Sequence, residues 1–316
     1  MCKRALEGGG TLKKEEVLQV LPERLRQMVE RSVADWNAVQ EIHIRLGKGI
    51  VITANGRKEL PDPNGQVVSR REFRELMEYI SNYSLYAFEE EIRKGFLTIP
   101  GGHRVGVSGR AVTEENEVKK LRNISFVNIR IAHERKGCAD SVMPYLFDKG
   151  RFLSTLLVSP PGAGKTTLLR DIVRNLASRD RAFGAKNVSV VDERSEIASC
   201  YMGVPQNDVG MFCDVLDACP KSEGIRMMLR SMAPEVIAVD EIGTGNEYEA
   251  LIEALTSGCS LLATVHGDSM RHIREKPFLN KLLVERMFER IIILRQKEHP
   301  GVIEGIFDAG GQVIMK

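Results

Sequence analysis

The run Thr155-Leu-Leu-Val-Ser-Pro-Pro-Gly-Ala-Gly-Lys-Thr-Thr-Leu-Leu-Arg170 decides the fold of this chain. A short apolar strand leads into a loop rich in proline and glycine, and a lysine and a threonine then open an amphipathic helix. This order of strand, loop and helix is typical of a phosphate-binding P-loop. Backbone N–H groups of such a loop point at phosphate oxygens, and the helix N-terminus adds its partial positive charge.

The P-loop predicts which residues bind nucleotide. We expect Lys165 to reach the β- and γ-phosphates and the Thr166 hydroxyl to bind Mg²⁺. The chain departs from the consensus at Ser159, where glycine is usual, but Gly162 and Gly164 can still take a positive φ. The alternative is a glycine-rich turn that binds no ligand. The predicted nucleotide-binding residues are Pro161, Gly162, Ala163, Gly164, Lys165, Thr166 and Thr167.

A second acidic motif follows about seventy residues further along the chain. Pro234-Glu-Val-Ile-Ala-Val-Asp-Glu241 is an apolar run that ends in two carboxylates. In P-loop ATPases a strand of this kind carries an aspartate of the Mg²⁺ shell, here Asp240. The adjacent Glu241 is placed to polarise the attacking water. The alternative is a buried strand with a solvated acidic end, but the two motifs together predict a Mg²⁺-dependent ATPase that uses ATP.

Composition and length limit the class of protein. The 316 residues suggest two domains, and a composition with 43% hydrophobic and 28% charged residues is ordinary for a soluble globular protein. The net charge of +2 is too small to imply a nucleic-acid partner. The six cysteines lack the spacing of metal ligands, and we expect free thiols. No apolar stretch approaches the ~20 residues of a membrane span, so we expect contact with a membrane only through a partner.

The pattern of elements divides the chain near residue 150. We place a mixed α/β domain of antiparallel character at residues 1–148 and a second domain at residues 149–316. In the second domain, helical patterns separate the predicted strands. These strands are 155–158, 188–191, 236–239, 261–265 and 291–294. The alternation predicts the α/β class, with an open, mostly parallel sheet and helices on both faces.

Polar residues follow two further strands of the predicted sheet. Residues 192–196 contain three acids, and Thr264 and His266 stand at the end of another strand. Ligands of such sheets bind outside the carboxyl ends of the strands. His266 could therefore sense a γ-phosphate, although a lone histidine in this position is more often structural.

Longer motifs carry a resemblance to a known family. They are Val191-Asp-Glu-Arg-Ser-Glu-Ile-Ala, Val204-Pro-Gln-Asn-Asp-Val-Gly210, Asp214-Val-Leu-Asp-Ala-Cys-Pro-Lys-Ser-Glu-Gly224, the run from Met228 to Gly243, and Gly101-Gly-His-Arg-Val-Gly106. Together they resemble the stage III sporulation protein AA family over about residues 40 to 285. That family is similar to the ATPases of type II and type IV secretion, so the resemblance implies a RecA-like P-loop domain after a smaller N-terminal domain.

The resemblance also implies roles for individual residues. Glu196 closes the acidic box of secretion ATPases, and His266 matches their histidine box. Arg104 and Arg130 of the first domain match arginines that reach the nucleotide, where a cation would neutralise phosphoryl charge. The alternative for both arginines is a solvated strand face. The implied catalytic residues are Glu241, Glu196, Lys165, Arg104, Arg130, Arg230 and His266, with Thr166 and Asp240 as metal ligands.

The resemblance implies a motor that hydrolyses ATP for an export channel between mother cell and forespore. We expect a homo-hexamer in the mother-cell cytoplasm that docks, through its first domain, on integral membrane components of the channel. The alternative function is a nucleic-acid-dependent P-loop ATPase, which near-neutral charge and 6% aromatic residues disfavour. Whether Glu241 or Glu196 activates the water stays open at this point.

Overall fold

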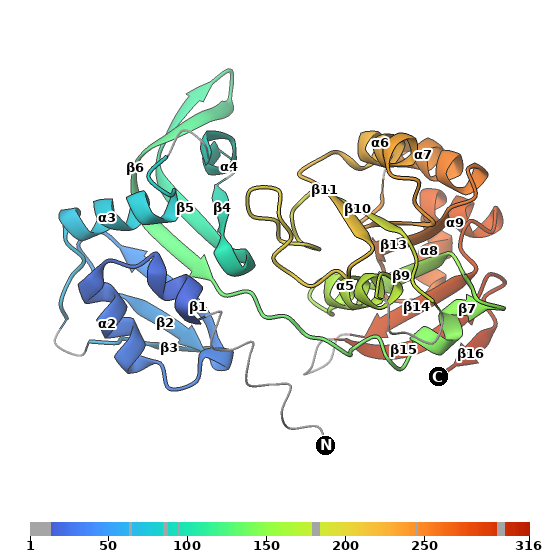
Figure 1. The fold of residues 1–316 in the computed structure, drawn as a ribbon, viewed down its shortest axis with the longest axis horizontal. Helices are drawn as coiled ribbons and strands as arrows, with labels where there is room; N and C mark the ends of the chain where they lie inside the picture. Colours follow the sequence, from blue (N-terminus) through green and yellow to red (C-terminus); the bar gives the residue numbers. More distant parts are fainter. Residues whose placement is uncertain are drawn as a thin grey trace. The chain divides into compact units, whose positions relative to one another are not determined.

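The chain folds into two compact units, Met1–His133 and Glu134–Lys316 (Figure 1). The computed structural model describes residues 14–62, 65–84, 88–93, 95–178, 184–243, 245–295 and 301–316. The division between the units lies N-terminal to the sequence-predicted boundary at residue 148. None of the helices within the described ranges is long and apolar enough to cross a bilayer.

The first unit is built on a six-stranded antiparallel sheet in the order β3-β2-β1-β6-β5-β4. Its strands are β1 (Val39–Arg45), β2 (Val51–Ala54), β3 (Arg57–Glu59), β4 (Phe96–Ile99), β5 (His103–Glu114) and β6 (Glu117–Arg130). Its helices are a turn over residues 14–19, α2 (Glu23–Ser32), α3 (Arg70–Ile80) and α4 (Glu89–Arg93), with short 3-10 turns at Trp36–Ala38 and Pro100–Gly102.

Alternation along the strands decides which face of this sheet is covered. In β1, Ile42 and Ile44 are buried while Glu41 and His43 stay partly exposed. A strand that alternates in this way has one face in the core and the other facing water. Helix α3 buries an apolar stripe, and a capping box of Ser69 with Glu72 satisfies its first backbone donors. The mixed α/β character predicted for this part of the chain is confirmed.

The second unit contains an eight-stranded sheet in the order β11-β10-β12-β13-β9-β14-β15-β16. The first six of these strands run parallel, and β15 and β16 add antiparallel strands at one edge. The strands are β9 (Thr155–Ser159), β10 (Val188–Asp192), β11 (Cys213–Asp217), β12 (Val236–Val239), β13 (Ser260–His266), β14 (Arg290–Arg295), β15 (Val302–Asp308) and β16 (Val313–Met315). All five predicted strands are present, and β11, β15 and β16 were not predicted.

Helices cover both faces of this sheet. They are α5 (Lys165–Leu176), α6 (Lys221–Ser231), α7 (Gly245–Thr256), α8 (Met270–Glu275) and α9 (Pro277–Val284), with a 3-10 turn at Met143–Leu146 and a small ribbon of β7 (Phe147–Asp148) and β8 (Arg151–Phe152). One core joins α5 to side chains such as Leu157 and Val190, and a second joins α6, α7, α8 and α9 to Leu156 and Val191. The central strands are buried on both faces, which explains their continuous apolar sequences.

The segment that opens the second unit packs on α5. Ala139, Val142, Met143 and Leu146 belong to the core on the α5 side of the sheet. The Ala139 N–H donates to the Asp171 carboxylate at 2.8 Å. Residues 134–148 therefore belong to the second unit by their packing.

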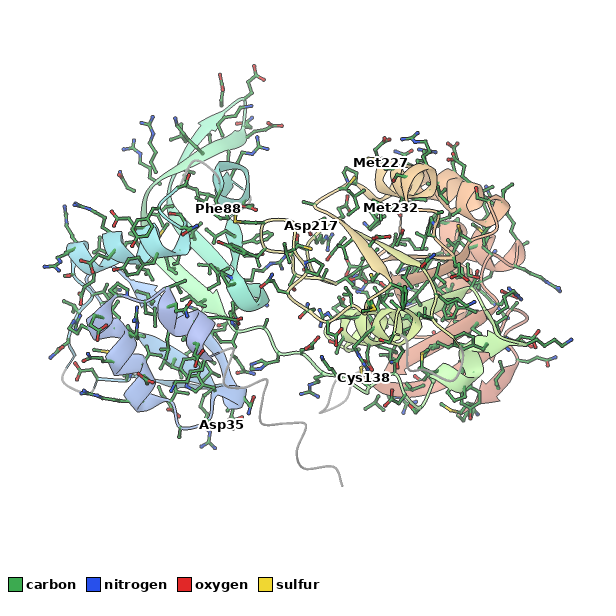
Figure 2. All side chains as sticks on the ribbon, viewed as in Figure 1. Asp35, Phe88, Cys138, Asp217, Met227 and Met232 are labelled. Atoms are coloured by element: carbon green, nitrogen blue, oxygen red, sulfur yellow. The ribbon has the colours of Figure 1, made fainter. Side chains whose placement is uncertain are left out.

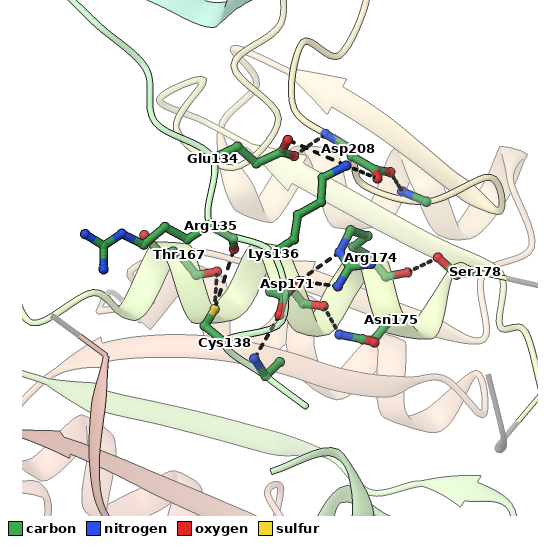
Figure 3. A network of polar contacts seen from close by, with 12 residues as sticks. Glu134, Arg135, Lys136, Cys138, Thr167, Asp171, Arg174, Asn175, Ser178 and Asp208 are labelled. Carbon is green, nitrogen blue, oxygen red and sulfur yellow. Dashed lines mark hydrogen bonds and ion pairs between the residues drawn. The ribbon is translucent and has the colours of Figure 1, made fainter. Parts of the chain in front are cut away.

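Two adjacent residues at the division are each fastened to a different unit. His133 Nε2 lies 2.6 Å from the Val39 carbonyl oxygen in the first unit. The next residue, Glu134, accepts the Asp208 backbone N–H at 2.7 Å in the second unit (Figure 3). Lys136 adds an ion pair of 2.6 Å to the Asp208 carboxylate.

Candidate nucleotide-binding site

The P-loop joins the buried end of β9 to the first turn of α5. Gly162 has a φ of 75° and Gly164 a φ of 92°, so both glycines hold backbone angles that other residues rarely take. Gly164 caps α5, and Lys165 is its first helical residue. The free N–H groups and positive dipole of this helix end therefore face the loop, as a phosphate site requires.

Ser159, where the consensus has glycine, fits the loop without strain. The residue is the last of β9 and continues its extended backbone. Its hydroxyl donates to the Pro160 carbonyl at 2.9 Å, and its own carbonyl accepts the Gly267 N–H at 3.1 Å. The serine is fully buried and its polar atoms are paired, so no glycine is needed here.

Two oxygen ligands suited to Mg²⁺ lie together at the start of α5. The Thr166 hydroxyl donates to Asp240 Oδ2 at 2.7 Å. The other Asp240 oxygen accepts a hydrogen bond from the Thr264 hydroxyl. Hydroxyl and carboxylate oxygens are the donors that Mg²⁺ prefers, and Mg²⁺ sites of nucleotides use one or two protein ligands with phosphate oxygens. The donor set therefore fits a magnesium ion.

Glu241 binds three basic side chains. Its Oε1 lies 2.6 Å from Lys165 Nζ and 2.9 Å from His266 Nε2, and its Oε2 lies 2.7 Å from Arg194 Nη1. Its backbone has a φ of 56° and is fixed by an N–H bond of 2.9 Å to the Thr264 hydroxyl. Burial raises the pKa of Glu241, but the Lys165 ammonium and then His266 and Arg194 outweigh burial and lower it below its ordinary value.

Strand order explains why these residues meet. Strands β10, β12, β13 and β9 are consecutive neighbours in the sheet and run parallel, so their carboxyl ends lie at one edge. His266 is in register with Ser159, next to the P-loop. Asp240 and Glu241 directly follow β12. The site therefore lies at the edge where ligands of open α/β sheets bind.

The acidic box after β10 is held by one buried carboxylate. Asp192 accepts backbone N–H bonds from Glu196, Ile197 and Ala198 at 2.8, 2.9 and 2.8 Å. Burial raises the pKa of Asp192 to about 6 in spite of these three donors. Arg170 of α5 donates to the carbonyls of Glu196 and Ile197 at 2.6 and 2.5 Å. The backbone of Glu196 is thus fixed to the P-loop helix.

The remaining predicted arginines lie elsewhere. Arg230 is near the end of α6, with Nη2 4.0 Å from Glu223 Oε1, at the edge where β12 begins. The P-loop follows the end of β9, which runs parallel to β12 and β13, so Arg230 lies at the opposite edge of the sheet. No described contact brings Arg230 to this P-loop, and its catalytic role stays a prediction.

Arg104 and Arg130 are direct neighbours in the first unit. They are opposite each other on β5 and β6. The Arg104 guanidinium lies 4.1 Å from the Phe96 ring centre, and Arg130 Nε lies 3.8 Å from Glu41 Oε1. Like charges directly opposite on adjacent strands are unfavourable for a sheet. The pair is therefore a concentration of positive charge, which the Glu41 carboxylate balances in part.

Sequence reasoning missed the partners that organise the site. Arg194 received no role, although its place directly after β10 puts it at the ligand-binding edge. Arg170 and Asp192 were not recognised as the supports of the acidic box. The structure brings together Lys165, Thr166, Asp240, Glu241 and His266, and fixes Glu196 through its backbone.

Comparison with known proteins places the chain in a family. Residues 11–314 match the family described as sporulation stage III, protein AA. The chain belongs to the sporulation stage III protein AA family. Stage III sporulation protein AA of Bacillus subtilis (strain 168) is 41% identical over 302 residues, which cover 95% of this chain and 97% of that protein. The family resemblance identified from the sequence is confirmed.

More distant relatives match only part of this chain. Protein SEEDLING PLASTID DEVELOPMENT 1 of Arabidopsis thaliana is 31% identical over 167 residues, 52% of this chain and 23% of that protein. Type II secretion system protein E of Klebsiella pneumoniae is 27% identical over 145 residues, 43% of this chain and 27% of that protein.

Solved structures confirm the predicted fold class. The Legionella pneumophila ATPase DotB matches with a TM-score of 0.57 and 17% identity, over 86% of this chain and 76% of that one. The pilus retraction motor PilT, solved with bound ADP, matches with a TM-score of 0.57 and 14% identity over the same shares. The RecA-like arrangement of the parallel sheet is thus shared with these two proteins.

Proposed function

We propose that this chain is a Mg²⁺-dependent ATPase that energises a protein-export complex during sporulation. One observation carries the proposal: the P-loop residues Lys165 and Thr166 contact the acids Glu241 and Asp240 at 2.6 and 2.7 Å. Hydrolysis of a phosphoanhydride requires a cation for the phosphates, ligands for the metal and a carboxylate for the water. The lysine, the threonine and the two acids supply these groups.

Each of the four side chains has a distinct task in this proposal. Lys165 binds β- and γ-phosphate oxygens, and Thr166 with Asp240 holds the metal. Mg²⁺ bound there would neutralise the charge that develops on the phosphates. Glu241 accepts a hydrogen bond from the attacking water, and its lowered pKa keeps it ionised as an acceptor at neutral pH.

Glu241 becomes available to water only when phosphate replaces it on Lys165. In the structure its Oε1 is occupied by Lys165 and His266. Phosphate oxygens compete for the same ammonium, so ATP binding frees the carboxylate. Glu196, whose backbone is fixed to α5 through Arg170, is the second candidate for orienting the water.

Substitution of Lys165 by alanine tests the proposal. Lys165→Ala removes the charge that neutralises the phosphates, and we expect weaker nucleotide binding with turnover lower by on the order of 10²–10³-fold. Phosphate release with and without Mg²⁺ is the measurement, and Lys58→Ala, which removes an exposed lysine of β3, is the control. Unchanged phosphate release by Lys165→Ala contradicts the P-loop assignment.

The proposal places the ATPase in the mother-cell cytoplasm, bound to the membrane through integral channel components. The name of the Bacillus subtilis relative supports a role in sporulation, and the Klebsiella relative supports a link to secretion. Fractionation of sporulating cells that lack the other channel components checks this placement, and we expect the protein in the supernatant. Retention in a salt-washed membrane pellet contradicts docking through partners.

A further inference from the structure

Arg194 is the basic side chain that the structure adds to the predicted site. Its Nη1 donates to Glu241 Oε2 at 2.7 Å, while Lys165 Nζ lies 2.6 Å from the other oxygen of the same carboxylate. One carboxylate thus separates the P-loop lysine from a second cation. Arg194 lies within the second unit, on the loop that follows β10.

Two sets of hydrogen bonds anchor the loop that carries Arg194. Asp192, two residues before Arg194, accepts N–H bonds from residues 196–198 and so closes the turn. The Ser195 hydroxyl donates at 2.5 Å to Asp217, which lies at the end of β11 (Figure 2). The Arg194 side chain itself is 63% exposed. A fixed backbone therefore presents a long side chain that has room to change partner.

Binding of ATP changes the balance of charge around Glu241. One carboxylate serves Lys165, His266 and Arg194 in the structure. The γ-phosphate brings more negative charge and three oxygens to the same place. A guanidinium binds phosphate oxygens in a two-pronged geometry that matches its planar fork. Arg194 can therefore move from Glu241 to phosphate without losing an anionic partner.

We propose that Arg194 binds the γ-phosphate of the nucleotide held by its own chain, and that it leaves Glu241 to do so. The inference rests on the proposed ATPase function and adds a cation supplied within the second unit. An arginine on the γ-phosphate stabilises the charge of phosphoryl transfer. Its departure also releases the second oxygen of Glu241, the proposed water-orienting carboxylate.

Nucleotides with and without a γ-phosphate test this contact. The affinity of the full chain for AMP-PNP and for ADP, each with Mg²⁺, is measured by calorimetry for wild type, Arg194→Gln and Arg194→Lys. We expect Arg194→Gln to bind AMP-PNP about tenfold more weakly or worse, because a charge-assisted hydrogen bond is lost. Its affinity for ADP should change by less than about threefold. Arg194→Lys keeps the charge but not the planar guanidinium, and its affinity for AMP-PNP should lie between those of wild type and Arg194→Gln.

A matched surface arginine provides the control. Arg271 of α8 is 88% exposed and pairs with Glu275 four residues on, so Arg271→Gln removes the same charge away from the loop. Circular dichroism checks that all variants fold. An unchanged ratio of AMP-PNP to ADP affinity in Arg194→Gln overturns the phosphate contact, even if turnover falls. If wild type binds neither nucleotide, the ATPase proposal fails, and this inference fails with it.

Discussion

Glu241 is held by three basic groups, so its substitution should affect hydrolysis and binding differently. Glu241→Gln keeps the shape but removes the proton acceptor, and we expect turnover to fall by about 10²–10⁴-fold. Nucleotide affinity should hold or increase, because Lys165 loses an anionic competitor of the phosphates. Single-turnover hydrolysis and AMP-PNP binding measure the two effects separately.

Glu196→Gln is the comparison for this experiment. Its backbone is fixed to Asp192 and Arg170, so its side chain can be changed without freeing the loop. If Glu196→Gln is the far slower enzyme, Glu196 and not Glu241 activates the water.

Part of the site could be predicted from the sequence because its residues directly follow the ends of predicted strands. Lys165 and Thr166 open a helix after one strand, and Asp240 ends another, so a parallel sheet brings them to one edge. The contact of Arg194 with Glu241 could not be predicted. It depends on how Asp192 folds the loop that follows β10, and an exposed arginine in a loop has no pattern of its own.

At the level of elements, the turn after β10 is held by a carboxylate that is costly to ionise. Burial raises the pKa of Asp192 from 3.8 to about 6, so the folded state binds its proton more tightly than the unfolded chain does. The protonated carboxyl therefore contributes to the free energy of unfolding. This contribution is complete below about pH 4 and is lost as pH rises through about 6.

We expect this loss to appear as a pH-dependent difference between wild type and Asp192→Asn. The free energy of unfolding of wild type, relative to the variant, should fall by up to roughly 3 kcal/mol between pH 4 and pH 7. Urea denaturation at several pH values measures it, and NMR titration of the Asp192 carboxyl checks the pKa directly. A difference that is constant or grows with pH contradicts the raised pKa.

The strands that could be predicted are those buried on both faces. Strands β9, β10 and β12 read as continuous apolar runs, because helices pack above and below them. The edge strand β11 contains Asp214 and Asp217 and is only half buried, so its sequence lacks this run. Strand β16 is the other edge strand, and its neighbour β15 is only partly buried, so burial constrains both sequences less.

At the scale of the whole molecule, we expect a ring of six chains in which Arg104 and Arg130 complete the nucleotide site of a neighbouring chain. The two guanidinium groups lie opposite each other on β5 and β6, so a phosphate of a neighbouring chain would meet two cations there. Sedimentation should show assembly when AMP-PNP is added. A chain with Arg104→Ala and Arg130→Ala, mixed with Lys165→Ala chains, should recover activity that neither has alone. Full activity in a strictly monomeric preparation refutes the ring.

The division between the compact units lies before residues 134–148, which form only a short 3-10 turn and the two-residue strand β7. Their packing against α5 shows to which unit they belong. Fold class could thus be predicted from periodicity, whereas the division between units depends on tertiary contacts.

His133 and Glu134 are adjacent residues that are hydrogen-bonded to different units, so no linker residues lie between their contacts. His133 is hydrogen-bonded to Val39, and Glu134 is hydrogen-bonded to Asp208. Between these two contacts the backbone can change only by rotation about the bonds that join the two residues. The peptide between these residues is planar and of fixed length, so few backbone torsions describe the junction. A few residues further on, Ala139 is tied to Asp171 of α5, the helix that begins at Lys165. We therefore expect a nucleotide that displaces this helix to alter the Ala139–Asp171 contact, close to the junction.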